Sequence, residues 1–218
     1  MTVNESYLYV LSRLNKGVTN KGDNIPKWRF VSAFNSQQLL WFDDRIKLDE
    51  TNNLRIDEIQ HLLVTKTGLV PNLSGTNYYE LNLPDDYYRY KRSTSLVPCE
   101  IANRLVKEGN INTLLLDTNW KPSVEWGETL CTIVGNKLKI YVDNFTISGV
   151  NFVYYRQPVK INMEDGFSDI NGIVNTNIDP EFTGSSLIEI LNMTCELLAS
   201  DNQDQWNLQT ATQRQRHT

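Results

Sequence analysis

The sequence predicts an α+β fold: a helical bundle built from N-terminal helices and a C-terminal helix, with an inserted antiparallel β-sheet or sandwich domain. Two observations predict this class. Residues 1–63 and 184–198 place apolar side chains three and four positions apart, as amphipathic helices do. The residues between them alternate apolar and polar side chains and are punctuated by turn-forming residues. Helices grouped at both ends of a block of strands are typical of an α+β protein, whereas a parallel α/β enzyme alternates the two.

The boundaries follow this change of pattern. We expect the N-terminal bundle helices over residues 1–63, and an inserted β domain with a long loop over residues 64–183. A C-terminal bundle helix and a docking tail complete the chain over residues 184–218. A chain of 218 residues is long enough for one sizeable domain or two small ones, each with a real core.

Three helices are expected in the N-terminal part. The first lies in ESYLYVLSRLNK and places four apolar residues on one face: Tyr7, Val10, Leu11 and Leu14. Pro26 suits the first turn of a long second helix, where a missing N–H costs nothing. The apolar stripe of that helix consists of Phe30, Phe34, Trp41 and Leu48. A third, shorter helix is expected after Asn53, with its inward residues being Ile56, Ile59, Leu62 and Leu63.

Three polar residues fall inside the apolar sector of the second helix: Asn35, Gln38 and Arg45. Buried polar groups need hydrogen-bond partners. Those partners lie either on another helix or on another subunit, so the three residues are candidates for contacts between subunits.

The β block begins near residue 64. TLCTIVGNKLKIYVD predicts a hairpin with its turn at Gly135-Asn136. DDYYRYKRS has the composition to stack bases and contact phosphates, but its aspartates favour an edge strand protected by basic residues. The stretch from Cys99 to Trp126 fits either a helix and a strand or two strands.

A last strand is expected in FTISGVNFVYYRQP, with one side formed by Val150, Phe152 and Tyr154. Pro158 ends the pairing because it has no N–H to donate. Arg156 stands at the strand end, where it can fix the following loop or pair with a carboxylate of a neighbouring subunit.

The C-terminal part starts with a loop from Met163 to Gly184 that is rich in glycine, asparagine and aspartate. Loops this long are more often functional or ordered by a partner. Helix returns in SSLIEILNMTCELLASDN, where Ser186 and Glu189 have the spacing of a capping box. The final stretch, QDQWNLQTATQRQRHT, is polar and compatible with a helix.

The composition is 40% hydrophobic and 22% charged, which is typical of a globular chain. The formal net charge of -5 argues against a general nucleic-acid binder, because phosphate contacts need clustered Lys and Arg. No apolar run approaches the ~20 residues of a membrane span, and MTVNESYLYV lacks the basic start of a signal peptide. We therefore expect no membrane contact and no secretion.

The sequence offers no motif for a cofactor or a metal. P-loop, dinucleotide-binding, nucleophile-elbow and HExxH patterns are all missing from it. Cys99, Cys131 and Cys195 have no zinc-ligand spacing, and each is expected to be a small buried apolar residue. His61 and His217 are far apart along the chain. We predict no catalytic, cofactor-binding or metal residue.

The nearest approach to a catalytic constellation is WKPSVEWGET. Here Glu125, Glu128 and the upstream Asp117 lie close to two tryptophans. Paired carboxylates are what a glycosidase uses, one as an acid and the other as a base or nucleophile. Carboxylates near turns are normally solvated and tryptophans commonly pack, so a structural interpretation is favoured.

Three phrases carry a resemblance to a known family: DNIPKWRFVSAFNSQQLLWFDDRIK, CEIANRLVKEGNINTLLLDTNWKPSVEWGETL and YYRQPVKI. They resemble structural proteins of crAss-like bacteriophages, the short-tailed phages that infect gut Bacteroidales. The resemblance runs from about residue 7 to residue 210. The overall plan is also similar to the head–tail connectors of short-tailed phages, called tail tubular, gatekeeper, adaptor or ring proteins, which pair a helical bundle with a β domain.

The resemblance implies a structural virion protein at the neck, between capsid and tail, assembled in the cytoplasm of the host bacterium. Its implied partners are the portal protein, adjacent ring or tail proteins, and copies of itself in a closed ring, a dodecamer matching the portal. Genomic DNA would pass through the ring without specific binding, which suits an acidic chain.

The resemblance also implies that the C-terminus docks on the portal. In this sequence the docking segment starts at about Ser200, and its expected contact residues are Trp206, Leu208, Arg214 and Arg216. The alternatives to a connector are a tail-associated glycan hydrolase that uses Glu125 and Glu128, or another minor tail or capsid structural protein.

Overall fold

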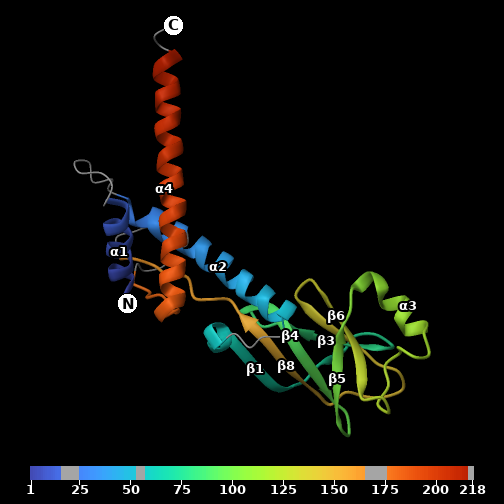
Figure 1. The fold of residues 1–218 in the computed structure, drawn as a ribbon. Coiled ribbons are helices and arrows are strands. Elements are labelled where there is room, and N and C mark those ends of the chain that lie inside the picture. The colour runs from blue at the N-terminus through green and yellow to red at the C-terminus, as the bar shows by residue number, and fades with distance from the viewer. Residues whose placement is uncertain (16–24, 53–56, 165–175, 216–218) are drawn as a thin grey trace. The chain divides into compact units, whose positions relative to one another are not determined.

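The computed structural model describes residues 1–15, 25–52, 57–164 and 176–215, and at residues 15, 50–52 and 201–215 it describes the backbone alone. The chain divides into two compact units. Residues 1–59 and 158–218 form a helical unit, and residues 60–157 form a β unit (Figure 1). The β unit is thus inserted into the helical one, and the chain from Pro158 onward belongs with the helices.

Helix α1 (Val3–Asn15) begins at a capping box. The Thr2 backbone N–H donates to Glu5 Oε2 at 2.8 Å, and the Glu5 N–H donates to Thr2 Oγ1 at 3.3 Å. These reciprocal bonds satisfy two N–H groups that have no partner inside the helix. At the other end, Arg13 stacks on the Tyr9 ring 5.1 Å from its centroid, close to the negative pole of the helix.

Helix α2 (Lys27–Asn52) begins directly after Pro26, whose carbonyl accepts the N–H groups of Arg29 and Phe30. Its large apolar residues that are fully or nearly fully buried are one, four or seven positions apart, so they share one broad face: Phe30, Phe34, Trp41, Phe42 and Ile46. This confirms the predicted stripe apart from Leu48, which is 43% exposed.

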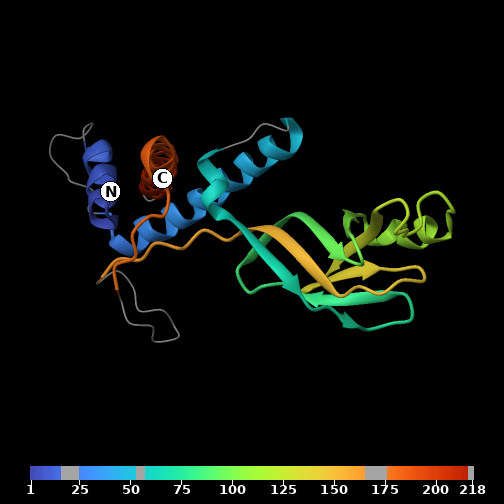
Figure 2. The same cartoon turned by 90° about the horizontal axis from the view of Figure 1, so that it is seen from below.

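Helix α4 (Gly184–Gln215) packs against both α1 and α2 (Figure 2). One stripe of this helix is buried: Leu187, Leu191, Thr194 and Leu198. The predicted capping box is wrong, because the helix already begins at Gly184 and Ser186 is buried within its first turn. Glu189 instead bonds across to Trp41 and Arg45 on α2.

The predicted third helix is a six-residue 3-10 helix, η1 (Asp57–Leu62). Ile59 and Leu62 are buried as expected, and Ile56 lies outside the described residues. Leu63 begins strand β1 and pairs with Tyr155, so the sheet takes up the chain before a longer helix can form. Among the described residues, the helical unit therefore packs three α-helices where the sequence predicted four.

Eight strands form one sheet in the order β1-β8-β4-β5-β6-β7-β3-β2. Their bounds are β1 Leu63–Leu69, β2 Asn72–Leu73, β3 Tyr78–Asn82, β4 Tyr87–Leu96, β5 Glu100–Leu105, β6 Glu128–Val134, β7 Lys137–Tyr141 and β8 Gly149–Arg156. The α+β class is confirmed, but the sheet is not wholly antiparallel because β5 and β6 run parallel. Parallel neighbours need a crossover, and here it contains η2 (Glu108–Asn110) and α3 (Ile111–Leu116).

The sheet is curled. β1 and β2 are its two edges, yet only Val70 and Pro71 separate them in the chain. A link of two residues is too short to cross a flat eight-stranded sheet, whose neighbouring strands lie about 4.8 Å apart. The core is accordingly shared by strands from both halves: Tyr79, Leu81, Leu83, Cys131, Leu138, Ile140, Val142, Ile147, Val150, Phe152 and Tyr154.

Three local features of the β unit were expected from the sequence. The hairpin of β6 and β7 is confirmed, with Val134 paired to Lys137 and Gly135 at a φ of 58° in the turn. The ambiguous stretch after Cys99 is a strand followed by the short helix α3, which packs on β6 and β7 through Ile111. The assignment of DDYYRYKRS to an edge strand is wrong, because β4 lies between β8 and β5.

The three cysteines differ in exposure. Cys131 is fully buried as predicted, and burial raises the pKa of its thiol to about 12. Cys195 is half-buried, and Cys99 is exposed in the turn between β4 and β5, so the expectation of three buried cysteines is wrong. Beside Cys131, the Tyr90 hydroxyl donates to the carbonyl of Asn103 at 3.1 Å, so this hydroxyl has a hydrogen-bond partner inside the sheet.

Candidate functional site

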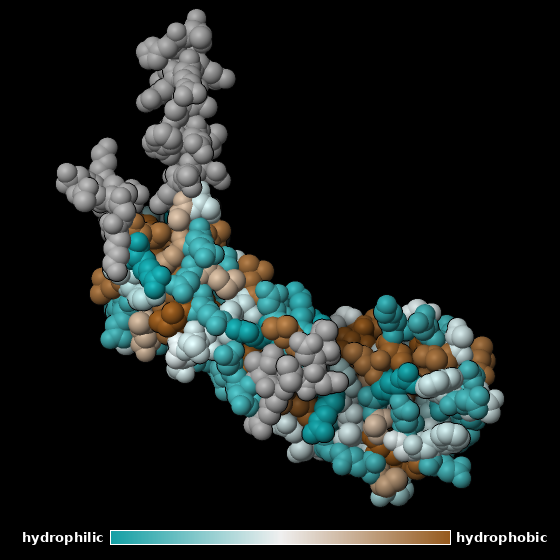
Figure 3. All heavy atoms as spheres, in the orientation of Figure 1, coloured by the Kyte–Doolittle hydropathy of each residue, from teal (hydrophilic) through white to brown (hydrophobic). Residues whose placement is uncertain are grey.

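The β unit contains an open groove of about 1010 Å³ beside the loop that leads into β6. Its walls come from β5, from residues 118–126, from the start of β6 and from residues 143–145. The two carboxylates that the sequence singled out, Glu125 and Glu128, both line it. Figure 3 shows hydrophobic residues gathered on the visible face of this unit near α3.

The loop is held by hydrogen bonds between its own residues. Asp117 Oδ1 accepts the Asn119 N–H at 2.9 Å, and the Asp117 carbonyl accepts the Lys121 N–H at 3.0 Å. Ser123 and Glu128 exchange both backbone hydrogen bonds and form a narrow bridge. Gly127 closes the turn at a φ of 67°, a conformation that glycine adopts without strain. Glu125 and Trp126 therefore project from a short, tied turn.

Arg104 on β5 organises one wall of the groove. Its guanidinium lies over the Trp120 ring, 4.5 Å from the centroid, and its Nε is 3.9 Å from Glu128 Oε1. Lys121 Nζ pairs with Asp143 Oδ2 at 2.9 Å. Both cations of the groove thus have a carboxylate beside them.

Glu125 and Trp126 differ from the rest of the lining. Glu125 is exposed and Trp126 is 77% exposed. Within the described part of the chain, neither the carboxylate nor the indole has a hydrogen bond, an ion pair or a ring contact. These two side chains are presented to solvent at the groove.

The predicted carboxylate constellation is assembled only in part. Glu125 and Glu128 share the groove, but Asp117 is not among the residues that line it. Glu125 is exposed and Glu128 faces Arg104, so neither has the apolar surroundings that a glycosidase provides for its general acid.

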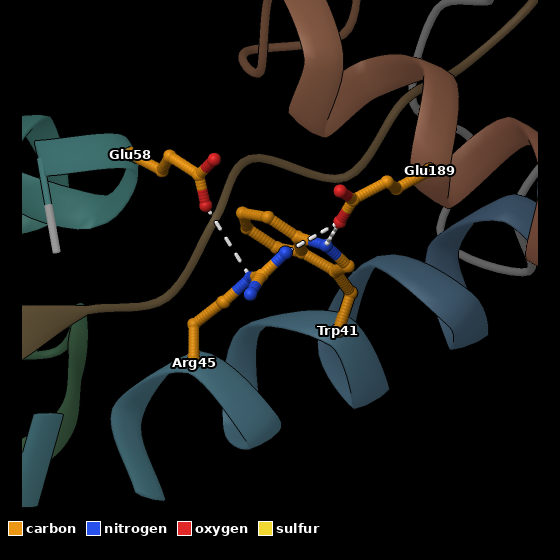
Figure 4. A network of polar contacts seen from close by, with 4 residues as sticks. All are labelled: Trp41, Arg45, Glu58 and Glu189. Atoms are coloured by element: carbon orange, nitrogen blue, oxygen red, sulfur yellow. Dashed lines mark hydrogen bonds and ion pairs between the residues drawn. The ribbon is translucent and has the colours of Figure 1, made fainter. Parts of the chain in front are cut away.

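A second polar cluster lies in the helical unit (Figure 4). The Trp41 indole N–H donates to Glu189 Oε2 at 2.8 Å, and Arg45 Nη2 donates to the same oxygen at 2.6 Å. Arg45 also pairs through Nε with Glu58 at 3.3 Å and stacks on the Trp41 ring at 5.0 Å. The hydrogen bond from Trp41 lowers the pKa of the Glu189 carboxyl most, burial opposes this, and Arg45 lowers the pKa further. The cluster ties α2 to α4 and η1.

The other two polar residues of α2 also find partners in their own subunit. Asn35 exchanges two hydrogen bonds with the backbone of Ile161, as donor at 3.1 Å and acceptor at 2.9 Å. Gln38 Nε2 donates to the Val159 carbonyl at 3.0 Å, while its buried Oε1 has no partner within the described residues. Together they attach the chain after Pro158 to α2. The partners that the described residues show are intramolecular, and the contacts between subunits stay a prediction.

Arg156 is the last residue of β8, is partly buried and pairs with Tyr87 of β4. Its Nη1 donates to the carbonyl of the next residue, Gln157, at 3.4 Å, so it contacts the start of the following loop. Of the predicted docking residues, Trp206, Leu208 and Arg214 lie on the described backbone of α4, and their side chains are outside the description. Arg216 lies outside the described residues.

Arg104, Trp41 and Glu189 were missed as site residues from the sequence. Trp41 was assigned to the core and Glu189 to a helix cap, while Arg104 lay in the ambiguous stretch. The signal in the sequence was chemical. Arg45 lies inside an apolar sector and therefore requires a carboxylate, and Glu189 supplies it from the face of α4 that meets α2.

No family model matches the sequence, and no curated protein is significantly similar to it. Within the described ranges, no three His, Cys, Asp or Glu side chains gather where they could hold a metal ion. No helix in that part of the chain has both the length and the hydropathy of a membrane span.

Proposed function

We propose that the chain is a structural protein of a phage neck, a head–tail connector that forms a ring below the portal and joins the capsid to the tail. The ring surrounds the channel through which genomic DNA leaves, and it contacts the portal, neighbouring ring or tail proteins, and copies of itself. The proposal is supported by the resemblance of three sequence phrases to crAss-like phage structural proteins and by the insertion of a β unit between helices.

The observation that carries the proposal is the length of α4. The helix has 32 residues and therefore extends for about 48 Å. Its buried stripe is described as far as Leu198, and the sequence after Ser200 is mostly polar, with Trp206 and Leu208 as its large apolar residues. Helices gain most of their stability from an apolar face packed on something else. A segment this polar cannot bury enough surface by itself, but Trp206 and Leu208 give it two apolar anchors for a partner's surface, and the portal is the partner we propose.

The ring follows from repetition. Each subunit in a closed ring has two neighbours, so modest interfaces add up once the portal gathers the copies. We expect the purified chain to be monomeric or weakly associated, and to assemble as a dodecamer on the portal. An acidic chain also suits a channel that DNA must pass without binding.

The groove supplies the one observation in favour of the alternative, a tail-associated glycan hydrolase. It brings Glu125 and Glu128 together with two tryptophans. The exposure of Glu125 and the arginine beside Glu128 count against an acid–base pair, so we place the connector first.

The docking claim is tested on the purified portal ring of the same virus. A chain truncated after Ser200 is expected to keep its helical and β circular dichroism and to lose portal attachment in sedimentation and electron microscopy. The double variant W206A/L208A is expected to weaken attachment at least tenfold. The matched control Q205A/Q209A changes two polar residues of the same segment and should attach normally. Normal connector assembly by the truncated chain would refute the proposal.

A further inference from the structure

Two clusters in this molecule join a tryptophan, an arginine and a glutamate. In the helical unit Arg45 stacks on Trp41 and bonds Glu189 (Figure 4). In the β unit Arg104 stacks on Trp120, with Glu128 beside it. In each cluster the flat guanidinium lies over an indole ring and faces a carboxylate. This arrangement satisfies an arginine through its charge and through its planar face.

The groove also contains a tryptophan and a glutamate, Trp126 and Glu125, that have no arginine beside them. Trp126 is 77% exposed, and it is adjacent to the exposed Glu125 on the tied turn that Gly127 closes. Both side chains line the groove, and within the described residues neither has a polar or ring partner. An indole this exposed presents a large apolar face to water.

The charge of the groove indicates what is missing. Its lining contains three carboxylates, on Glu125, Glu128 and Asp143, and two cations, on Arg104 and Lys121. Both cations are already beside a carboxylate, so the unmatched charge is the negative one on Glu125. A ligand that complements the groove must therefore bring a positive charge and a surface that stacks on indole.

We infer that the groove binds an arginine side chain presented by a partner protein, with the guanidinium stacked on Trp126 and paired with Glu125. Lysine satisfies the charge but has no planar group to stack. A neutral sugar can stack on the ring but leaves the carboxylate without a counter-charge. The open groove of about 1010 Å³ leaves room for the backbone on either side of the arginine, so the occupant is a peptide segment.

The inference concerns the β unit and does not depend on the proposed place of the chain in a virion. It is tested by two-dimensional NMR of the full chain, following the indole N–H signals of its five tryptophans. The Trp126 signal is assigned from the variant W126F. Titration with N-acetyl-arginine amide is expected to shift that signal saturably, with an apparent Kd in the millimolar range because the site is exposed. N-acetyl-lysine amide should bind more weakly, and the neutral N-acetyl-citrulline amide should not bind.

The variant E125Q is expected to weaken arginine binding about two- to fivefold, the range of an exposed ion pair. Its matched control is E108Q, which removes an exposed carboxylate of the same unit that does not line the groove. Equal shifts with arginine and citrulline, or unchanged affinity in E125Q, would overturn the inference. Binding of a neutral N-acetylglucosamine hexamer in place of arginine would also overturn it and would favour a glycan ligand.

Discussion

Glu189 connects the helices of this protein through a single oxygen. Its Oε2 accepts hydrogen bonds from the Trp41 indole and from the Arg45 guanidinium, and Arg45 also reaches Glu58. Both bonds are stronger to the ionised carboxylate than to the neutral carboxyl, so they lower its pKa. One charge therefore adds to the packing of α4 on α2, beside the buried apolar stripe of each helix.

This charge gives a pH dependence whose sign is fixed. Because the folded-state pKa of Glu189 lies below the ordinary value of 4.5, its contribution is fully present above pH 4.5. The contribution is lost as the pH falls through the lowered folded-state value. The variant E189Q is expected to unfold at a lower temperature than the native chain at pH 7, at a cost of about 1 kcal/mol, since the side chain is half exposed.

Thermal unfolding followed by circular dichroism between pH 7 and pH 3 measures this difference. The difference in unfolding temperature between the native chain and E189Q should become smaller below pH 4.5. The control E196Q changes an exposed carboxylate on the same helix and should follow the native curve. A gap that stays constant down to pH 3 would contradict the role of the ionised carboxylate.

Individual residues show how much of the site could be predicted from the sequence. Arg45 in an apolar sector predicted a partner, but Glu189 lies 144 positions away and nothing local connects them. Glu125 and Glu128 were predicted together because one turn carries both. Arg104 was missed because its contact with Trp120 depends on the parallel pairing of β5 with β6, a long-range feature.

Among the helices and strands, the sequence predicted correctly those whose form depends on bonds between near neighbours in the chain. The β6–β7 hairpin was predicted because the two-residue turn sets its register. The third helix was placed correctly but is a short 3-10 helix, because Leu63 already pairs with β8. The all-antiparallel sheet was wrong, because α3 carries the chain across to a parallel neighbour. The spacing of Ser186 and Glu189 is that of a capping box, but Glu189 accepts a hydrogen bond from Trp41 on α2.

The turn at Gly127 gives a test of local backbone conformation. An added Cβ would meet nothing within 4 Å there, so the only cost of G127A is the φ of 67°, about 1–2 kcal/mol. Gly109 also has open space around it but no positive φ, so G109A should be neutral or slightly stabilising. Urea unfolding of both variants measures the difference. Equal stability of the two would show that the turn does not hold its left-handed conformation.

For the whole molecule, the two units differ in how the chain builds them. The β unit is one continuous segment with its own core, whereas the helical unit is assembled from both ends of the chain. We therefore expect a fragment of residues 60–157 to fold alone. Its near-ultraviolet circular dichroism should show a cooperative thermal transition.

A matched fragment that starts at Val70 lacks β1. It loses Val64 and Leu69, which pack on the core, and it leaves β8 without one of its two neighbours. This shorter fragment is expected to lose the cooperative transition. If residues 60–157 also melt without cooperativity, the β unit depends on the helices for its fold.

The pairing of Leu63 with Tyr155 has a consequence for how such a chain can evolve. The polypeptide enters and leaves the sheet on two hydrogen-bonded strands, about 5 Å apart. The helical unit, which the β unit interrupts here, therefore has to connect to two chain ends that lie next to each other. The intervening hundred or so residues can therefore be exchanged for another module with adjoining first and last strands, while the surrounding helices keep their sequence.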